Sequence, residues 1–297
     1  MGISGTKSVS CRSSWIKKDQ ATGATAYNTC SHVPFATYYE EFDHSGLHDM
    51  FGYTQAKKGH DRNGKPVAQK DQIHYARRII ESLLYDGKDR PTDFYKKLEK
   101  QIDSDCMIVA PSLMQLTAKN VLPITFAHVI AKEFGVAVEE NIYQRPNPVK
   151  KRDMTGEERL THDAAFFGPV KKGQKYFLVD DVMTMGGTMA ALRGFIERQG
   201  GEVIGLAVLA DGTSPLQMGK RADKDVGIPF APTPADLADL DKRFGGGLPR
   251  LNTIFKGHAG HDAEELTARE IRYIAHKFGR QGSRGQRTAT LEHRLGG

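Results

Sequence analysis

Two adjacent carboxylates and a glycine-rich turn are the residues of this chain whose types and spacing most directly suggest chemistry. Asp180 and Asp181 follow the apolar run 176–179, and the turn 184–188 (TMGGT) comes shortly after them. A turn of this kind at the start of a helix directs backbone N–H groups and threonine hydroxyls toward one anion. Two carboxylates beside it suit the vicinal hydroxyls of a ribose, directly or across a Mg²⁺ ion. The pattern therefore predicts recognition of a ribose 5-phosphate.

The segments around this pattern alternate between strand and helix. Short apolar runs predict strands, and an apolar residue every three or four positions predicts a helix. Pro123 near the start of one helical run and Gly135 at its end fit the usual boundaries of a helix. The sequence thus predicts an α/β fold with a parallel sheet and ligands at the carboxyl ends of its strands. The predicted strands are 106–110, 141–145, 176–179 and 202–210, and the predicted helices between them are 122–134 and 189–199.

The order of apolar strand, two acids and threonine–glycine turn resembles the phosphoribosyl-pyrophosphate (PRPP) motif of type I phosphoribosyltransferases. In that family the acidic pair binds the ribose hydroxyls and the turn holds the 5-phosphate. The resemblance therefore implies that Asp180 and Asp181 bind the ribose of PRPP and its Mg²⁺. Met185 departs from the family pattern, which usually has a second threonine there. The residues that the resemblance assigns to the 5-phosphate are Thr184, Met185, Gly186, Gly187 and Thr188.

Two further loops take roles from the same resemblance. The family's pyrophosphate loop follows the first strand, so it corresponds to residues 111–115, where Pro111 and Ser112 are candidates for binding; this segment contains no Lys or Arg. A mobile loop that closes over PRPP corresponds to residues 146–162, which are polar and without clear periodicity. The alternative interpretation is an ordinary solvated loop. Its cations, which would neutralise the departing pyrophosphate, are Lys150, Lys151, Arg152 and Arg159.

The resemblance covers the middle of the chain and leaves both ends open. We expect a flexible segment at residues 1–30, a phosphoribosyltransferase-like α/β domain at 31–211, and a C-terminal hood or extension at 212–280. Residues 281–297 are basic with almost no apolar side chains, so we expect a flexible tail. The tail is either a solvated terminus or a weak arm for the phosphates of a nucleic acid.

Composition is compatible with an enzyme of this kind. The chain has 297 residues, 42 Lys and Arg against 36 Asp and Glu, and a net charge of +6. That excess favours phosphate ligands but is not a nucleic-acid signature by itself. The three cysteines form no CxxC pair, and no apolar run is long enough to span a membrane. We expect a cytoplasmic protein that forms a homodimer.

Two functions of different class follow from the resemblance. The first is catalysis, in which a nucleobase-like nitrogen displaces pyrophosphate from Mg²⁺-bound PRPP. The second is a non-catalytic PRPP or nucleotide sensor, or a nucleic-acid-handling accessory. The order of Tyr143 to Arg145, a basic loop, Glu158-Arg159 and Phe166-Phe167 is similar to ComF-type proteins, although this chain lacks their cysteine-rich zinc ribbon.

The basic loop generates a test by proteolysis. If 146–162 closes over PRPP, trypsin will cut the ligand-free protein at Lys150, Lys151 or Arg152, and Mg²⁺-PRPP will slow this cleavage. Mass spectrometry of the fragments over time measures the rate. Equal rates with and without the ligand would reduce the segment to a surface loop.

Overall fold

A five-stranded parallel sheet forms the centre of the molecule in the computed structural model. The strand order is β3-β10-β9-β4-β6, and every neighbouring pair is parallel. The bounds are β3 Phe35–Tyr39, β4 Met107–Val109, β6 Ala137–Val138, β9 Lys175–Met183 and β10 Glu202–Asp211. The sheet confirms the expected α/β class. The structure describes residues 12–14, 16–18, 25–30, 35–39, 44–113, 120–146, 154–212, 230–244, 247–279 and 283–296.

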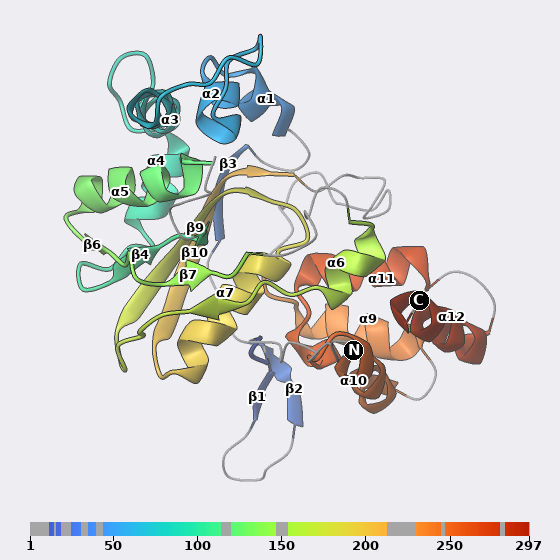
Figure 1. The fold of residues 1–297 in the computed structure, drawn as a ribbon. Coiled ribbons are helices and arrows are strands. Elements are labelled where there is room, and N and C mark those ends of the chain that lie inside the picture. The colour runs from blue at the N-terminus through green and yellow to red at the C-terminus, as the bar shows by residue number, and fades with distance from the viewer. Residues whose placement is uncertain are drawn as a thin grey trace, which may run out of the picture.

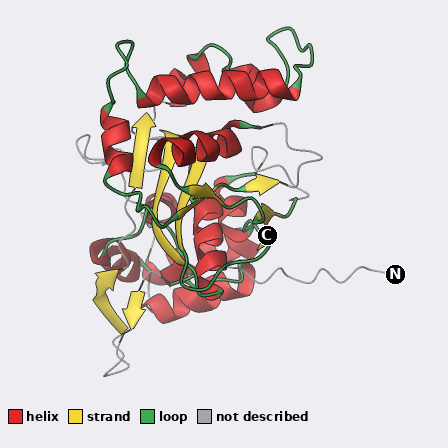
Figure 2. Ribbon diagram, turned by 90° about the vertical axis from the view of Figure 1, so that its left-hand side faces the viewer, coloured by secondary structure: helices red, strands yellow, loops and turns green. Residues whose placement is uncertain are grey.

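Helices cover both faces of the sheet because the central strands are apolar on both sides (Figures 1 and 2). Phe177 and Val179 of β9 pack into a core with α3 (Gln69–Leu84) and α5 (Leu122–Phe134). Tyr176 and Leu178 belong to the opposite core, with α7 (Gly187–Arg198). The alternation of side chains along a strand thus divides β9 between two cores. Gly135, with φ of 68°, ends α5 as the sequence predicts.

Shorter elements surround the sheet. Helices α1 (His44–Asp49), α2 (Tyr53–Lys58) and α4 (Asp93–Glu99) belong to the N-terminal part of the chain. A three-stranded sheet has the order β5-β7-β8, with β5 Ser112–Leu113, β7 Tyr143–Gln144 and β8 Phe166–Phe167. An antiparallel hairpin joins β1 (Ile16–Lys18) to β2 (Thr25–Cys30). No helix among the described residues is long and apolar enough to cross a membrane.

The C-terminal residues form a helical unit with a core of its own. It contains α9 (Pro234–Arg243), α10 (Gly247–His258), η2 (Ala263–Glu265), α11 (Ala268–Lys277) and α12 (Arg284–Gly296). Capping boxes begin three of these elements, at Thr233 with Asp236, at Asp262 with Glu265 and at Thr267 with Glu270. Local side chains thus bind the first N–H groups of α9, η2 and α11. Figure 1 shows the unit beside α6 (Gly156–Thr161), on the side of the sheet away from α3.

Both predicted flexible ends differ from the structure where it describes them. Residues 284–296 of the expected tail are helical, and Leu291 and Leu295 are buried in the core of the helical unit. The two leucines lie four residues apart, so both side chains are on the face of α12 that packs against the helical unit. Within 1–30, Arg12 is fully buried between Asp163 and Glu270, and the β1–β2 hairpin is formed. The partners of Arg12 are distant in sequence, so composition does not reveal them.

The docking of α12 predicts that the tail contributes to stability. Leu291→Ala should lower the free energy of unfolding by about 2–5 kcal/mol, because it removes a buried side chain and leaves a cavity. Urea unfolding measures the change. Glu292→Ala, at the exposed neighbouring position, is the matched control. Equal midpoints for the two variants would mean that α12 does not pack on the unit.

Candidate functional site

The acidic pair lies near the carboxyl end of the central strand β9. The strand continues through Asp180 and Asp181 to Met183, four residues past the predicted end, because it stays paired with β10 up to Asp211. The turn that follows leads directly into α7, whose N-cap is Gly186 with φ of 84°. This left-handed conformation favours glycine, as the motif requires. The pair and the start of α7 therefore lie side by side, as the sequence predicts.

Asp181 is a buried junction between three elements. Its side chain is 4% exposed and forms an ion pair with Lys57 of α2. The side-chain amide of Asn120, just before α5, donates a hydrogen bond of 3.1 Å to Asp181 Oδ2, and the Val182 N–H donates one of 2.9 Å to Oδ1. Asp181 is thus buried, although it lies near the carboxyl end of the strand. The physical reason is that α2 and the start of α5 fold over this end of the sheet.

The two carboxyl groups have opposite electrostatic environments. Burial, together with the charge of Asp181, raises the pKa of Asp180 well above its ordinary value. Burial acts in the same direction on Asp181, but the Lys57 charge and the hydrogen bonds to this carboxylate together outweigh it and lower the pKa of Asp181. The same pairing raises the pKa of Lys57 against the effect of its own burial. Asp181 and Lys57 are therefore charged at neutral pH, whereas Asp180 keeps its proton to a higher pH than an ordinary aspartate does.

The turn of the motif is fixed by the C-terminal unit. Met185 is buried in the core of that unit, and its carbonyl oxygen accepts a hydrogen bond of 2.6 Å from the Thr267 hydroxyl. A Cβ at Gly186 would lie 3.2 Å from Phe230 and from Thr267, so the close packing also favours glycine. Packing explains the departure at Met185: an apolar side chain there anchors the turn to the helical unit.

Arg12 and Glu270 lie against Gly187 and leave no room there for a side chain. A Cβ at Gly187 would lie 2.8 Å from Arg12 Nη2 and 3.0 Å from Glu270 Oε1. Arg12 Nη1 donates to Glu270 Oε2 at 2.6 Å, and Nη2 contacts Asp163 Oδ1 at 2.7 Å. Thr184 and Thr188, on either side of the glycines, are partly exposed. The turn is therefore covered on one side by buried charged groups and is accessible through its threonines.

The structure describes only part of the two loops that the resemblance assigns to the pyrophosphate and to closure over PRPP. Pro111 follows β4 and is partly exposed, and Ser112 begins β5; the side chain of Ser112 and residues 114–119 lie outside the described part. The segment 146–162 contains a helix, α6, that sequence periodicity did not reveal, and the Thr155–Glu158 capping box begins it. Arg159 is on α6, and its buried Nε has no hydrogen-bond partner among the described residues. Lys150, Lys151 and Arg152 lie outside the described residues.

Sequence analysis missed several side chains at the site. Asn120 accepts the Leu122 N–H at 3.2 Å and so helps to begin α5; an Asn just before a helix is a signal that could have identified it. Lys57 sits far from the motif in sequence, on a helix that no pattern predicted. Arg269 of α11 is buried and forms an ion pair with Asp211 at the end of β10, with no sequence signal for the pairing.

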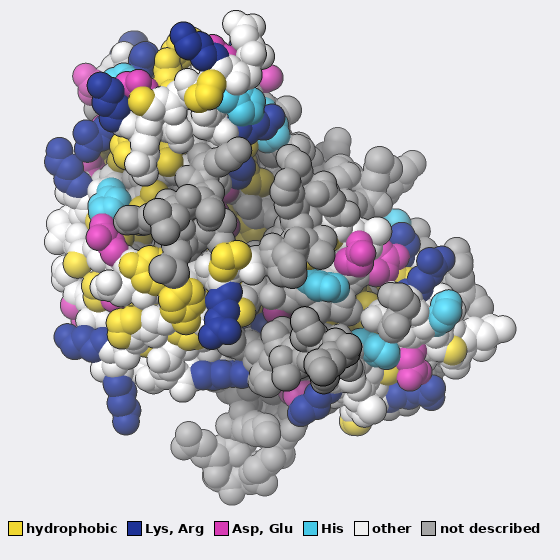
Figure 3. Space-filling model, in the orientation of Figure 1, with side chains coloured by type: hydrophobic (Ala, Val, Ile, Leu, Met, Phe, Trp, Pro, Cys, Tyr) yellow, Lys and Arg dark blue, Asp and Glu magenta, His cyan; other side chains and the backbone are white. Residues whose placement is uncertain are grey.

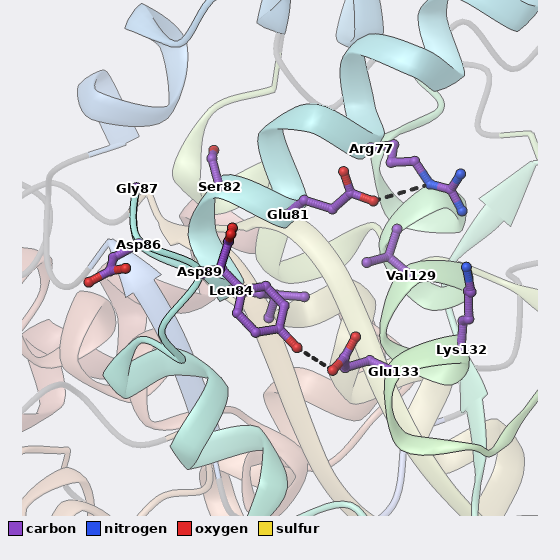
Figure 4. A pocket seen from close by; sticks show the side chains of 11 residues that line it. Arg77, Glu81, Ser82, Leu84, Asp86, Gly87, Asp89, Val129, Lys132 and Glu133 are labelled. Atoms are coloured by element: carbon purple, nitrogen blue, oxygen red, sulfur yellow. Dashed lines mark hydrogen bonds and ion pairs between the residues drawn. The ribbon is translucent and has the colours of Figure 1, made fainter.

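A separate hollow of about 680 Å³ lies between α3, α5 and the turn that follows α3 (Figure 4). Its lining includes Arg77, which pairs with Glu81, and Tyr85, whose hydroxyl donates to Glu133. These groups are at the end of α5 remote from Asn120, roughly 15 Å along the helix axis. The hollow is therefore not part of the acidic-pair site. Figure 3 shows basic and acidic side chains interspersed over the described surface of one face of the molecule.

Comparison with known proteins finds a family model that matches the segment containing this site. Residues 123–234 match the model of the phosphoribosyl transferase domain. Protein TraN of Escherichia coli is 33% identical over 196 residues, which are 66% of this chain and 42% of that protein. An adenine phosphoribosyltransferase of Thermotoga petrophila is 46% identical over 67 residues, 22% of this chain and 36% of that protein. The chain thus spans less than half the length of these relatives.

The solved structures that match include an adenine phosphoribosyltransferase from Thermoanaerobacter pseudethanolicus. It is 19% identical, with a TM-score of 0.28, and the match covers 48% of this chain and 70% of that one. The matched domain begins in α5 and extends past β10, so it contains both the acidic pair and the turn.

The unlike environments of the two carboxyl groups predict opposite effects on stability. Because the pKa of Asp180 is raised, its contribution to stability is full below its ordinary value of 3.8 and is lost as pH rises through the raised value. Asp180→Asn should therefore raise the melting temperature under alkaline conditions. Because the pKa of Asp181 is lowered, its contribution is present above 3.8 and is lost only as pH falls through the lowered value.

Asp181→Asn should accordingly destabilise the protein at pH 7, by about 3 kcal/mol, since it leaves the Lys57 ammonium without its carboxylate. Thermal unfolding of both variants between pH 4 and about 9 measures these effects. Parallel stability curves for the two variants would contradict the assignment of different environments.

Proposed function

The chain carries a phosphoribosyl transferase domain, and on that premise we propose that it transfers the ribose 5-phosphate group of Mg²⁺-PRPP to a nucleobase-like nitrogen and releases pyrophosphate. The observation that supports this most directly is the acidic pair beside the glycine turn at the carboxyl end of β9. Ligands of parallel α/β sheets bind at this end of the strands.

The start of α7 suits the 5-phosphate. Its first N–H groups have no carbonyl partner within the helix, and they carry the positive end of the helix dipole. The partly exposed hydroxyls of Thr184 and Thr188 flank this position. Thr267 and Arg12 hold the turn from behind, so that it does not need to rearrange when a phosphate binds.

The donors available for magnesium fit an ion that arrives with its substrate. Within the described ranges, no group of three or more His, Cys, Asp or Glu side chains could form a complete cage. Mg²⁺ commonly binds through one or two carboxylates together with substrate phosphates and water. The resemblance assigns these carboxylates to Asp180 and Asp181, of which Asp180 is the more exposed. The ion would neutralise charge on the pyrophosphate leaving group.

The reaction itself places few demands on protein side chains. The acceptor nitrogen forms a bond to C1 of the ribose as the bond from C1 to the pyrophosphate oxygen breaks, and pyrophosphate leaves with the electron pair. Positive charge develops on the sugar, so positioning and charge neutralisation are the main contributions of the site. The segment 146–162 would exclude water from C1 if it closes as proposed.

A non-catalytic PRPP or nucleotide sensor is the second candidate. One observation favours it: Asp181, which the resemblance assigns to the ribose, is engaged by Lys57 and Asn120. A site with this arrangement could bind without turning over. The similarity of the loop to ComF-type proteins, the homodimer and the cytoplasmic location stay predictions.

Pyrophosphate release and PRPP binding, measured on one preparation, separate the two candidates. We expect release in the presence of Mg²⁺-PRPP and one base from a panel that begins with adenine, the base named for one of the relatives. Calorimetry reports binding independently of turnover. Asp180→Asn, expected to be well folded, should abolish PRPP binding. Binding without release for every base would favour the sensor, and no binding would reject both.

A further inference from the structure

The geometry points to different roles for the two aspartates: Asp181 is a positioning residue that holds Lys57 at the site, and Lys57 binds the pyrophosphate group of the ligand. This inference rests on the proposed function, because it assigns residues within the same PRPP site. It departs from the symmetric arrangement that the resemblance implies, in which both carboxylates bind the ribose.

The first observation is that Asp181 is already engaged. Its Oδ2 accepts from Lys57 and from Asn120, and its Oδ1 accepts from the Val182 N–H. With 4% of the side chain exposed, little of it can reach a sugar. Asp180 is partly exposed, with its Oδ1 accepting the Asp181 N–H at 2.8 Å, and thus remains the carboxyl group that a ribose hydroxyl or a metal ion can approach.

The second observation is that Lys57 sits on a rigid junction and is itself accessible. The Ala56 carbonyl of α2 accepts the Val121 N–H at 3.1 Å, which ties the end of α2 to the start of α5. Asn120 at the same point binds Asp181. The Lys57 side chain is nevertheless 30% exposed. An ammonium group has three N–H donors, so one can remain on Asp181 while others bind a phosphate oxygen.

The third observation is the charge balance of the site. Two ionised carboxylates without a cation would repel a polyphosphate, and in a partly buried site this repulsion is weakly screened. The Lys57 ammonium pairs with Asp181 and offsets its charge. The repulsion that an incoming polyphosphate meets at the acidic pair is therefore reduced.

The loop that the resemblance assigns to the pyrophosphate has no cationic side chain, and Lys57 would provide one. Residues 111–115, which the resemblance assigns to the pyrophosphate, contain no Lys or Arg. Lys57 supplies a cation at the same end of the sheet, from α2, whose Ala56 carbonyl accepts the Val121 N–H just before α5. Lys119 is the nearest cation in sequence to that loop, and it lies outside the described residues. It is the natural competing candidate for the same role.

Two probes and a small set of variants test the assignment. Inorganic pyrophosphate with Mg²⁺ reports the proposed contact, and ribose 5-phosphate, which lacks the pyrophosphate, reports the remainder of the site. Lys57→Met should weaken pyrophosphate binding about 10-fold or more, the loss of one charged hydrogen bond to the ligand. It should leave ribose 5-phosphate binding within about twofold, because Lys57 is assigned no contact with the ribose or the 5-phosphate. Lys57→Arg should restore most of the affinity. Lys58→Met, at the exposed neighbouring position, is the matched control.

Asp181→Asn distinguishes positioning from direct contact. It should weaken pyrophosphate binding as Lys57→Met does, and the double variant should be no weaker than either single one, because the two residues act as a unit. If Asp181 bound the ribose itself, Asp181→Asn would instead weaken ribose 5-phosphate, which would overturn the assignment.

Three further outcomes would also overturn it. Tighter binding in Lys57→Met would make Lys57 a competitor of the ligand, and equal losses for both probes would make it structural. A specific loss of pyrophosphate in Lys119→Met but not in Lys57→Met would transfer the role to Lys119. Failure of the wild-type protein to bind ribose 5-phosphate or Mg²⁺-PRPP would instead reject the proposed function itself, and the inference with it.

Discussion

The buried carboxylate of Asp181 is the interaction on which the geometry of the site depends. It lies on the central strand and joins α2 through Lys57 and the start of α5 through Asn120. A charge taken out of water requires such partners, since an unpaired buried carboxylate costs several kcal/mol, about 3–5 when one partner is removed. The N-terminal helices are therefore coupled to the motif by electrostatics as well as by apolar packing. This coupling explains why the neighbouring Asp180 is the more accessible of the two acids.

The turn of the motif depends in turn on the C-terminal unit. Met185 enters the core of that unit, and Thr267, which caps α11, donates to the Met185 carbonyl. A threonine at 185 would add a hydroxyl but would remove this apolar anchor from the core. The C-terminal unit thus supports the glycine turn structurally.

The core of the fold was predictable because its signals are local. The apolar run 176–179, the glycines of the turn and the Pro123–Gly135 boundaries of α5 each fix backbone conformation through neighbouring residues. The long-range pairs were not predictable. Arg12 with Glu270 is the clearest case, because nothing near Arg12 in sequence indicates that it will be fully buried. The helix α12 was missed for a related reason: two leucines among charged residues stabilise a helix only when a partner surface is present.

These long-range pairs also determine what the glycines of the motif do. Gly186 and Gly187 resemble phosphate-binding residues in sequence, yet in the structure they also permit the close approach of Thr267, Phe230 and Arg12. Each of these groups comes from a segment outside the strand–turn–helix that carries the motif. Arg12 additionally binds Asp163, which follows α6. The turn, the end of the 146–162 segment and the helical unit are therefore held by one buried set of charges. We expect a change at any of them to alter the position of the glycine turn, because close-packed charged groups cannot shift independently without losing their hydrogen bonds.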